Sequence, residues 1–159
     1  SIDNHDNIWI ADPECNQIWV FDDQSNALRK LQCENYNLKE PISIYCLPNG
    51  EYLIGDKSES SLKHFDAQDN LIHEVGKTGL GVDEIYFMTW HPKHGIFGAD
   101  YWNNQIVHFN NKLQVQSIYQ KPGRRAGQLG KVAGLSVCND QLAVGNFDGG
   151  KVQIFDLTS

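Results

Sequence analysis

Short runs of apolar residues alternate with polar turns along the chain, and the runs return at a fixed spacing. The first pair is Ile8–Asp12, which ends in a carboxylate, and Gln17–Phe21, which ends in an aromatic ring. The acid or amide recurs at Asp12, Asp56, Asp100 and Asn146, and the ring recurs at Phe21, Phe65, Phe109 and Phe155. Both markers step by 44, 44 and 46 residues, so the pattern predicts a repeat architecture.

Each repeat reads as four short strands, of which the second ends at the acid or amide and the third at the Phe. Alternation with period two, bounded by Pro and Gly turns, is typical of half-buried antiparallel strands. The expected first strands are Ile42–Leu47, Phe87–Trp90 and Gly134–Cys138, and the expected fourth strands are Ala27–Leu31, Leu71–Val75 and Leu113–Tyr119. No stretch shows a helical period, so the chain is predicted to be all-β.

Four antiparallel strands every 44 to 46 residues fit the blades of a β-propeller. The chain is expected to be a single propeller segment, 1–159, within a partial ring or a larger propeller. The predicted blades are 1–36 (partial), 37–80, 81–126 and 127–159 (partial). Such a segment leaves two apolar sheet faces open, to be covered by further sequence or by self-association that completes the ring. A free-standing small propeller is the alternative.

Charge and hydropathy exclude several classes of protein. The net charge of −7 opposes binding of nucleic acid through its phosphates. No run of 18 apolar residues is present, so no membrane span is expected. The first residues, Ser1–Asp6, are neither basic nor apolar, and no signal peptide is predicted from them.

The four cysteines are too few and too scattered for a disulfide framework or a paired-cysteine metal site. Cys46 and Cys138 fall at similar places in their repeats and are expected to be core thiols, with a disulfide involving Cys15 or Cys33 as the alternative. No Asn has Ser or Thr two positions later, so no N-glycosylation is predicted. Thiols without such sites favour a reducing compartment such as the cytoplasm.

Several motifs together resemble the NHL-repeat family. Ile8-Trp-Ile-Ala-Asp12 followed by Asn16-Gln-Ile-Trp-Val-Phe-Asp22 resembles the family's hydrophobic strand ending in Ala-Asp and the Asn-x-Arg-Ile-x-x-Phe strand that follows it, and Ala99–Phe109 matches the same pattern. Gly123-Arg-Arg-Ala-Gly-Gln-Leu129 is similar to the linker between NHL blades, and Gly76–Gly79 is a looser copy. Gln17, Gln105 and Asn146 depart from the pattern. The resemblance implies a propeller, and its members include peptide and RNA binders, sensors and lyases, so function stays open.

The repeated residues are interpreted as structural. An Asp at the end of a second strand can accept backbone N–H groups from the tight loop that follows, which favours a local role for Asp12, Asp56 and Asp100 over metal or acid–base chemistry. The repeated Phe residues recur where one blade must pack on its neighbour, so they are expected in the core.

The loops that follow the second strands should lie at the same end of each sheet as the loops that lead into the first strands. These loops hold large aromatics and arginines, which are typical of interface hot spots. The candidate binding residues are Tyr101, Trp102, Arg124, Arg125 and Phe147, with Tyr36 in a neighbouring loop. The alternatives are that the two rings at 101 and 102 pack over the adjacent loop and that the Arg pair is a solvated turn. The prediction is a non-enzymatic module that binds a protein or peptide.

Catalytic and metal chemistry receives less support. His91 and His94 fall in a turn at the opposite end and are expected to be exposed, while His64 and His108 occupy equivalent positions that indicate a structural role. The first strands offer Ser43, Thr89 and Ser136 but no cluster of His and acids, and no phosphate loop or nucleophile motif is present. No cofactor or metal is therefore predicted. A propeller lyase or hydrolase with residues in missing blades remains an alternative, as does RNA binding through Lys121, Arg124, Arg125 and Lys131.

Overall fold

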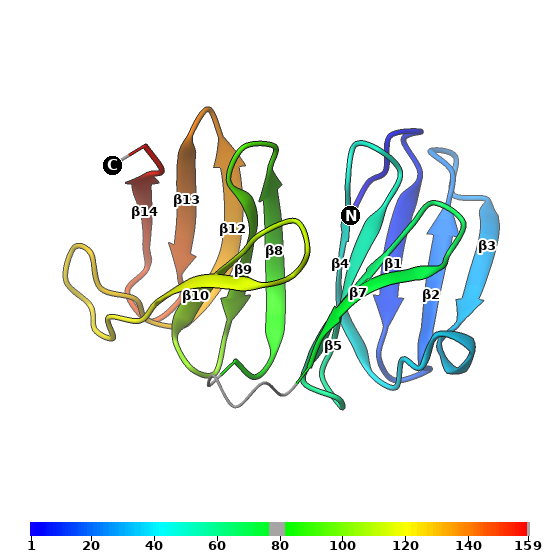
Figure 1. Ribbon diagram of the computed structural model, residues 1–159, viewed down its shortest axis with the longest axis horizontal. Coiled ribbons are helices and arrows are strands. Elements are labelled where there is room, and N and C mark those ends of the chain that lie inside the picture. Colours follow the sequence, from blue (N-terminus) through cyan, green and yellow to red (C-terminus); the bar gives the residue numbers. More distant parts are fainter. Residues whose placement is uncertain (77–81, 159) are drawn as a thin grey trace. The chain divides into compact units, whose positions relative to one another are not determined.

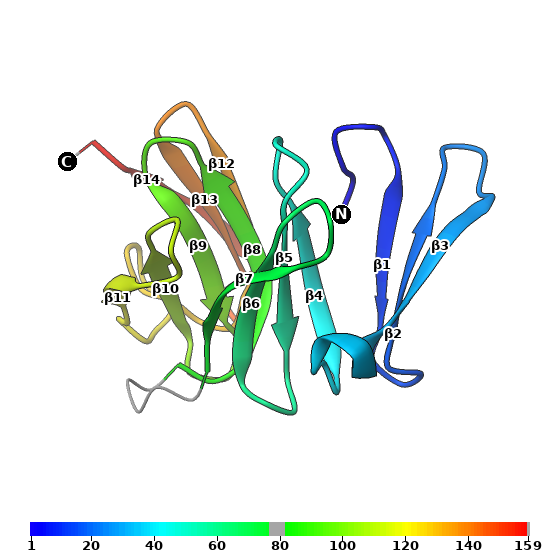
Figure 2. The same cartoon turned by 45° about the vertical axis from the view of Figure 1, so that its right-hand side comes forward.

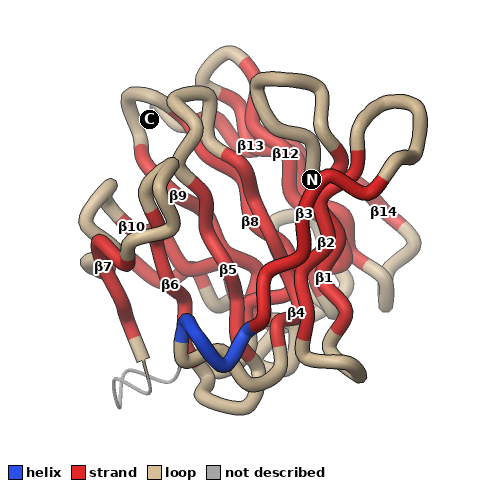
Figure 3. The backbone as a smooth tube through the Cα atoms, turned by 90° about the vertical axis from the view of Figure 1, so that its right-hand side faces the viewer, coloured by secondary structure: helices blue, strands red, loops and turns tan. Residues whose placement is uncertain are grey.

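The computed structural model describes residues 1–76 and 82–158, and it is built from antiparallel strands. Figure 1 and Figure 2 show these strands as consecutive meanders, and Figure 3 shows that one short 3-10 turn, η1 (Cys33–Tyr36), interrupts them. The chain divides into two compact units, Ser1–Lys77 and Thr78–Ser159. Within the described residues, no helix has the length and apolar character needed to cross a bilayer.

Unit 1 contains two sheets in which each strand pairs with its neighbour in sequence. The first has the order β1-β2-β3 and the second β4-β5-β6-β7. Their strands are β1 (Ile8–Asp12), β2 (Gln17–Phe21), β3 (Ala27–Gln32), β4 (Pro41–Cys46), β5 (Tyr52–Asp56), β6 (Ser61–Phe65) and β7 (Leu71–Val75). An isolated bridge between Ile2 and Ile8 adds the end of a further strand to the first sheet.

Unit 2 also contains one four-stranded and one three-stranded sheet, but in the opposite order along the chain. A four-stranded sheet, β8-β9-β10-β11, precedes a three-stranded one, β12-β13-β14. The strands are β8 (Ile85–His91), β9 (Gly95–Asp100), β10 (Gln105–Phe109), β11 (Val115–Tyr119), β12 (Val132–Cys138), β13 (Gln141–Asn146) and β14 (Lys151–Asp156). Four antiparallel meanders in sequence order are what a propeller of four-stranded blades requires.

The all-β prediction is confirmed, and the second and third strands end at the predicted acid, amide or Phe in most repeats. The fourth strand of the second repeat, Leu71–Val75, has the predicted bounds. In the third repeat that strand begins later, at Val115, because Leu113 has a positive φ of 57° and belongs to the preceding turn. The looser linker copy at Gly76–Gly79 falls largely outside the described residues.

Each unit has an apolar core between its two sheets. In unit 1, Trp9, Ile18, Val20 and Leu31 of the first sheet pack with residues of the second, including Tyr52, Ile54 and Phe65. In unit 2, Phe97, Ala99 and Ile106 pack with Leu142, Val144 and the partly buried Phe155. Of the four repeated Phe residues, Phe65 and Phe109 are fully buried, and Phe21 and Phe155 are half-buried.

The cysteine expectation is partly wrong. Cys46 pairs with Tyr52 of the unit 1 core and is half-buried, whereas Cys138 pairs with the exposed Gln141 and is itself exposed. Cys15, Cys46 and Cys138 are free thiols. The similar places of the two cysteines in their repeats do not reveal that their side chains lie on opposite faces of their sheets.

The repeated carboxylates bind two loops at once. Asp100, which is fully buried, accepts hydrogen bonds from the backbone N–H of Asp83 (2.9 Å), from Asn103 Nδ2 (2.9 Å) and from Gln105 Nε2 (2.9 Å). Asp56 likewise accepts the N–H groups of Lys39 and Glu40. The carboxylate therefore joins the loop after its own strand to the segment that leads into the first strand of the same sheet.

Replacing Asp100 with Ala removes the acceptor of four hydrogen bonds in a buried position, so we expect a loss of about 3 kcal/mol in the free energy of unfolding. The matched control is Asp12→Ala, since Asp12 is half-buried and accepts the Cys15 N–H at an exposed turn, and the expected loss is at most about 1 kcal/mol. Urea unfolding followed by circular dichroism measures both. Equal losses for the two variants would show that burial of the carboxylate does not determine how much it contributes to the free energy of unfolding.

Candidate functional site

The loops at one end of unit 2 bring an aromatic pair and a lysine together. Tyr101 and Trp102 directly follow β9, and their rings meet edge to face with centroids 5.2 Å apart. The Lys131 ammonium lies 5.2 Å from the Tyr101 ring centroid and 5.1 Å from the Trp102 ring centroid. A cation at this distance from two rings is attracted by the negative potential of both faces. We call Tyr101, Trp102 and Lys131 the aromatic–lysine cluster.

Further contacts hold this cluster in place. The Trp102 indole N–H donates to Glu84 Oε2 at 2.9 Å, and the Tyr101 ring packs against Tyr86 at 5.5 Å between centroids. The two rings thus contact the adjacent loop, as one interpretation of the sequence predicted. Trp102 nevertheless remains 55% exposed, so part of its surface is open to a ligand.

Phe147 reaches the same cluster through the backbone of Lys131. Its N–H donates to the Lys131 carbonyl at 2.8 Å, and its ring is 71% exposed. Lys131 therefore contacts one candidate ring loop with its backbone and the other with its side chain. Nothing in the local sequence of Lys131 marks it for this place, because the contacts depend on how the turn after β13 pairs with the segment before β12.

The arginine pair lies in the neighbouring loop of unit 2. Arg124 and Arg125 are exposed, and their carbonyl oxygens accept hydrogen bonds from Lys151 Nζ. Gln153 fixes the same loop by accepting the Gly127 N–H (2.6 Å) and donating to the Gln128 carbonyl (2.8 Å). The loop backbone is anchored to β14 while both guanidinium groups face solvent, so this is an ordered basic surface.

A small hollow of about 140 Å³ separates this loop from the turn after β13. Arg124, Asp148, Asn104 and Leu129 are among the residues that line it. Tyr36, the remaining aromatic of the predicted loops, belongs to the other unit, where it packs edge-on against Phe65 at 5.9 Å in the core. The structure thus places the five candidate binding residues in loops of unit 2 together with Lys131, and Tyr36 is not among them.

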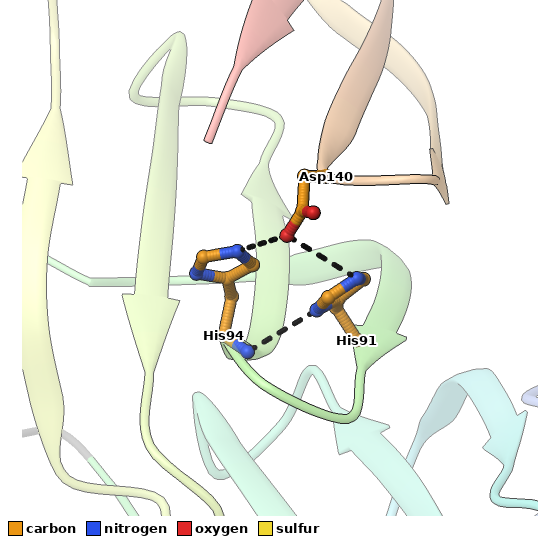
Figure 4. A group of neighbouring side chains, drawn as sticks. All are labelled: His91, His94 and Asp140. Carbon is orange, nitrogen blue, oxygen red and sulfur yellow. Dashed lines mark hydrogen bonds and ion pairs between the residues drawn. The ribbon is translucent and has the colours of Figure 1, made fainter. Parts of the chain in front are cut away.

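The histidine turn at the opposite end of unit 2 differs from expectation. His91 and His94 are half-buried rather than exposed, and both point toward Asp140 of the turn between β12 and β13 (Figure 4). His94 Nε2 lies 2.7 Å and His91 Nε2 lies 3.8 Å from Asp140 Oδ1. The expectation of exposure was wrong because Asp140 is 46 residues away in sequence, and its approach depends on the packing of two sheets.

These three side chains have the ligand types of a metal site, and their ligand atoms lie within 4.8 Å of one another. The hydrogen bonds of His91 argue against that use. Its Nδ1 accepts the N–H groups of Lys93 (3.2 Å) and His94 (3.3 Å), so in the neutral ring the proton is on Nε2, the atom that faces Asp140. A metal bound at Nε2 would need that proton on Nδ1 instead, which conflicts with both backbone donors.

His64 and His108 occupy the equivalent positions that their spacing predicts, with different partners. His64 Nε2 lies 2.8 Å from Glu51 Oε2, and burial lowers the pKa of His64, which favours the neutral ring. The His108 ring stacks on Phe97 at 4.6 Å, and its Nε2 contacts the His94 carbonyl. Each ring is held in a packed sheet of its own unit.

Comparisons with known proteins identify the fold and no family. No model of a known protein family matches the chain, and no curated protein sequence matches it either. Solved propellers match it in structure. The WD40 β-propeller domain of Doa1 superposes with a TM-score of 0.71 at 10% identity, over 96% of this chain and 47% of that one.

Two further structures agree. The Pan2 WD40 domain of Neurospora crassa matches with a TM-score of 0.71 at 14% identity, over 100% of this chain and 46% of its own. An inactive variant of virginiamycin B lyase from Staphylococcus aureus, solved with quinupristin, matches with a TM-score of 0.66 at 13% identity, over 100% of this chain and 55% of its own. The chain is thus built of propeller blades and spans about half the length of the propellers that it matches.

The His94 bond lowers the pKa of Asp140 below its ordinary value of 3.8, with Lys93 and His91 contributing as nearby charges. A lowered folded-state pKa stabilises the fold above the unfolded-state pKa, and that contribution is lost as pH falls through the folded-state pKa. We therefore expect Asp140→Asn to lower the melting temperature at neutral pH and to differ progressively less from the wild type below pH 3.8.

Thermal unfolding at a series of pH values measures this difference. Asp23→Asn is the control, because Asp23 is exposed and the substitution makes the same change of charge. A difference between Asp140→Asn and the wild type that stays constant across the pH series would contradict the expectation.

Proposed function

We propose that this chain is a non-enzymatic interaction module that binds a protein or peptide at the loop end of unit 2. The observation that carries the proposal is the aromatic–lysine cluster, in which Trp102 is fixed by Glu84 and Lys131 yet is 55% exposed. A ring that is ordered before binding loses little conformational entropy when a partner covers it. Trp, Tyr and Arg are the residues that most often dominate binding energy at interfaces.

The charges of the same loops indicate the chemistry of the partner. Arg124 and Arg125 present two positive charges beside the ring surface, in a protein whose net charge is −7. A local positive surface attracts acidic partners and disfavours basic ones. We therefore propose a peptide segment with an apolar or aromatic anchor for Trp102 and with acidic residues nearby.

The motifs around the repeated Asp support an NHL-like repeat. Asn16 and Asn104, which precede the third strands of the first and third repeats, both have a left-handed backbone with φ of 52°. Asn adopts this conformation more readily than most residues, so the Asp–Asn spacing has a physical reason. NHL assignment remains a proposal beside the propeller fold.

Catalysis of the propeller-lyase kind and RNA binding have less support. The described first strands contribute Ser43, Thr89 and Ser136, and the group of His91, His94 and Asp140 lies in turns between strands (Figure 4). RNA binding would use Arg124 and Arg125, and its affinity would fall steeply with salt because phosphate contacts release counterions.

Selection from a displayed library of random peptides tests the proposal. We expect enriched peptides to contain an aromatic or large apolar residue near Asp or Glu, and Trp102→Ala to weaken their binding by at least about tenfold. Leu28→Ala is the matched control, since Leu28 is 54% exposed in unit 1 and its substitution should change nothing.

A second measurement separates the alternatives. Fluorescence anisotropy with a single-stranded RNA probe at two salt concentrations should show no binding that depends on Arg124 and Arg125. The proposal is wrong if Trp102→Ala leaves the binding of selected peptides unchanged, or if the RNA probe binds and the library yields no consensus.

A further inference from the structure

The strand register gives every sheet two distinct faces. Side chains of residues paired across antiparallel strands lie on the same side of a sheet, and successive residues alternate sides. In the first sheet, Ile8 pairs with Phe21 and Ile10 with Trp19. We call the side of these residues, and of their equivalents in later repeats, the leading face. The opposite side, where Trp9 pairs with Val20 and Ala11 with Ile18, is the trailing face.

The core of unit 1 shows how these faces meet. Trp9, Ile18 and Val20, on the trailing face of the first sheet, pack with Tyr52, Ile54 and Phe65 of the second. The latter three residues are the equivalents, 44 positions later, of Ile8, Ile10 and Phe21. A trailing face therefore packs on the leading face of the next sheet.

Unit 2 follows the same rule with different side chains. Phe97, Ala99 and Ile106 are the trailing-face equivalents of Trp9, Ala11 and Ile18. They pack in one cluster with Leu142, Val144 and the partly buried Phe155, which are the leading-face equivalents in the last sheet. Because two independent cores obey the rule, the mode of packing is a property of the repeat.

The leading face of the first sheet is apolar and open. Ile8 is 37% and Ile10 is 47% exposed. The Trp19 and Phe21 rings stack with centroids 6.0 Å apart, and the Lys30 ammonium lies 5.0 Å from the Trp19 ring centroid. Large side chains thus project from this face.

The trailing face of the last sheet is apolar and open as well, and its side chains are smaller. Val152 and Ile154 are 70% and 58% exposed, and they pair with Gly145 and Ala143 of β13. An open hollow of about 490 Å³ lies here, lined by Gly145, Phe147 and Val152 among others. Small residues beside a hollow are suited to receive large rings from a partner.

We propose that the trailing face of β12–β14 in one copy of this chain packs on the leading face of β1–β3 in a second copy, so that two copies form a dimer through two such contacts. The occupant follows from three observations. In both cores a trailing face packs on a leading face. The large rings of Trp19 and Phe21 on the open leading face complement the small Gly145 and Ala143 on the open trailing face. The chain spans 46% to 55% of the propellers that it matches, so two copies supply the blades of one such ring.

The contact is head to tail, because it joins different surfaces of the two copies. Such an interface closes into a ring only when the rotation between copies brings the free trailing face of the last copy onto the free leading face of the first. Closure at two copies leaves neither apolar face in water, which is the driving force for the dimer.

Light scattering of the 159-residue chain measures its mass directly. We expect twice the 18.0-kDa mass of one chain, and we expect Ile154→Lys and Ile10→Lys each to halve it to the monomer. Mixing these two variants should restore a dimer, because each supplies the intact face that the other lacks. Far-UV circular dichroism checks that each variant is folded.

Trp102→Ala is the matched control, since Trp102 is a large exposed ring that lies on neither face. It should keep the dimer mass while losing peptide binding, so failure of this proposal and failure of the proposed function give different results. A folded monomer, an unfolded chain, an assembly of another size, or a dimer that survives Ile154→Lys would each overturn the proposal.

Discussion

Apolar side chains on both faces of every sheet are the constraint on which the rest of the structure depends. A sheet with one apolar face is satisfied by a single layer of packing, whereas these sheets need a neighbour on each side. The cores of the two units meet this need with one arrangement, in which the trailing face of a sheet covers the leading face of the next. Burial of apolar area in this way supplies the main favourable term for folding.

The buried carboxylates make that packing compatible with short loops. Asp56 and Asp100 accept N–H groups from the segment before a sheet as well as from the loop within it. Backbone donors that face no strand partner are thereby satisfied without water. The loop ends are fixed while the loop tips are free to carry Tyr101, Trp102 and Phe147, so the scaffold and the candidate site use different residues of the same loops.

Much of the fold can be predicted from the sequence because the same strand pattern recurs in each of the four repeats. The 44-residue steps of Asp12, Asp56 and Asp100 located the strand ends without any long-range information. Contacts that form once per chain could not be found in this way. Asp140 reaches His94 across 46 residues, and Lys131 reaches Trp102 across the gap between two sheets. Both depend on packing geometry, which a periodic pattern does not contain.

The nearly constant step between repeats, 44, 44 and 46 residues, has a consequence for how such chains change during evolution. A duplication or deletion of 44 residues adds or removes one leading and one trailing face together, so the faces that remain still match their new neighbours. Nearest-neighbour stability of this kind lets repeat proteins gain and lose units without redesign of a shared core. Insertions of other lengths between Asp83 and Gln105 would disturb the hydrogen bonds of Asp100, so this carboxylate favours changes in whole blades over changes within that segment.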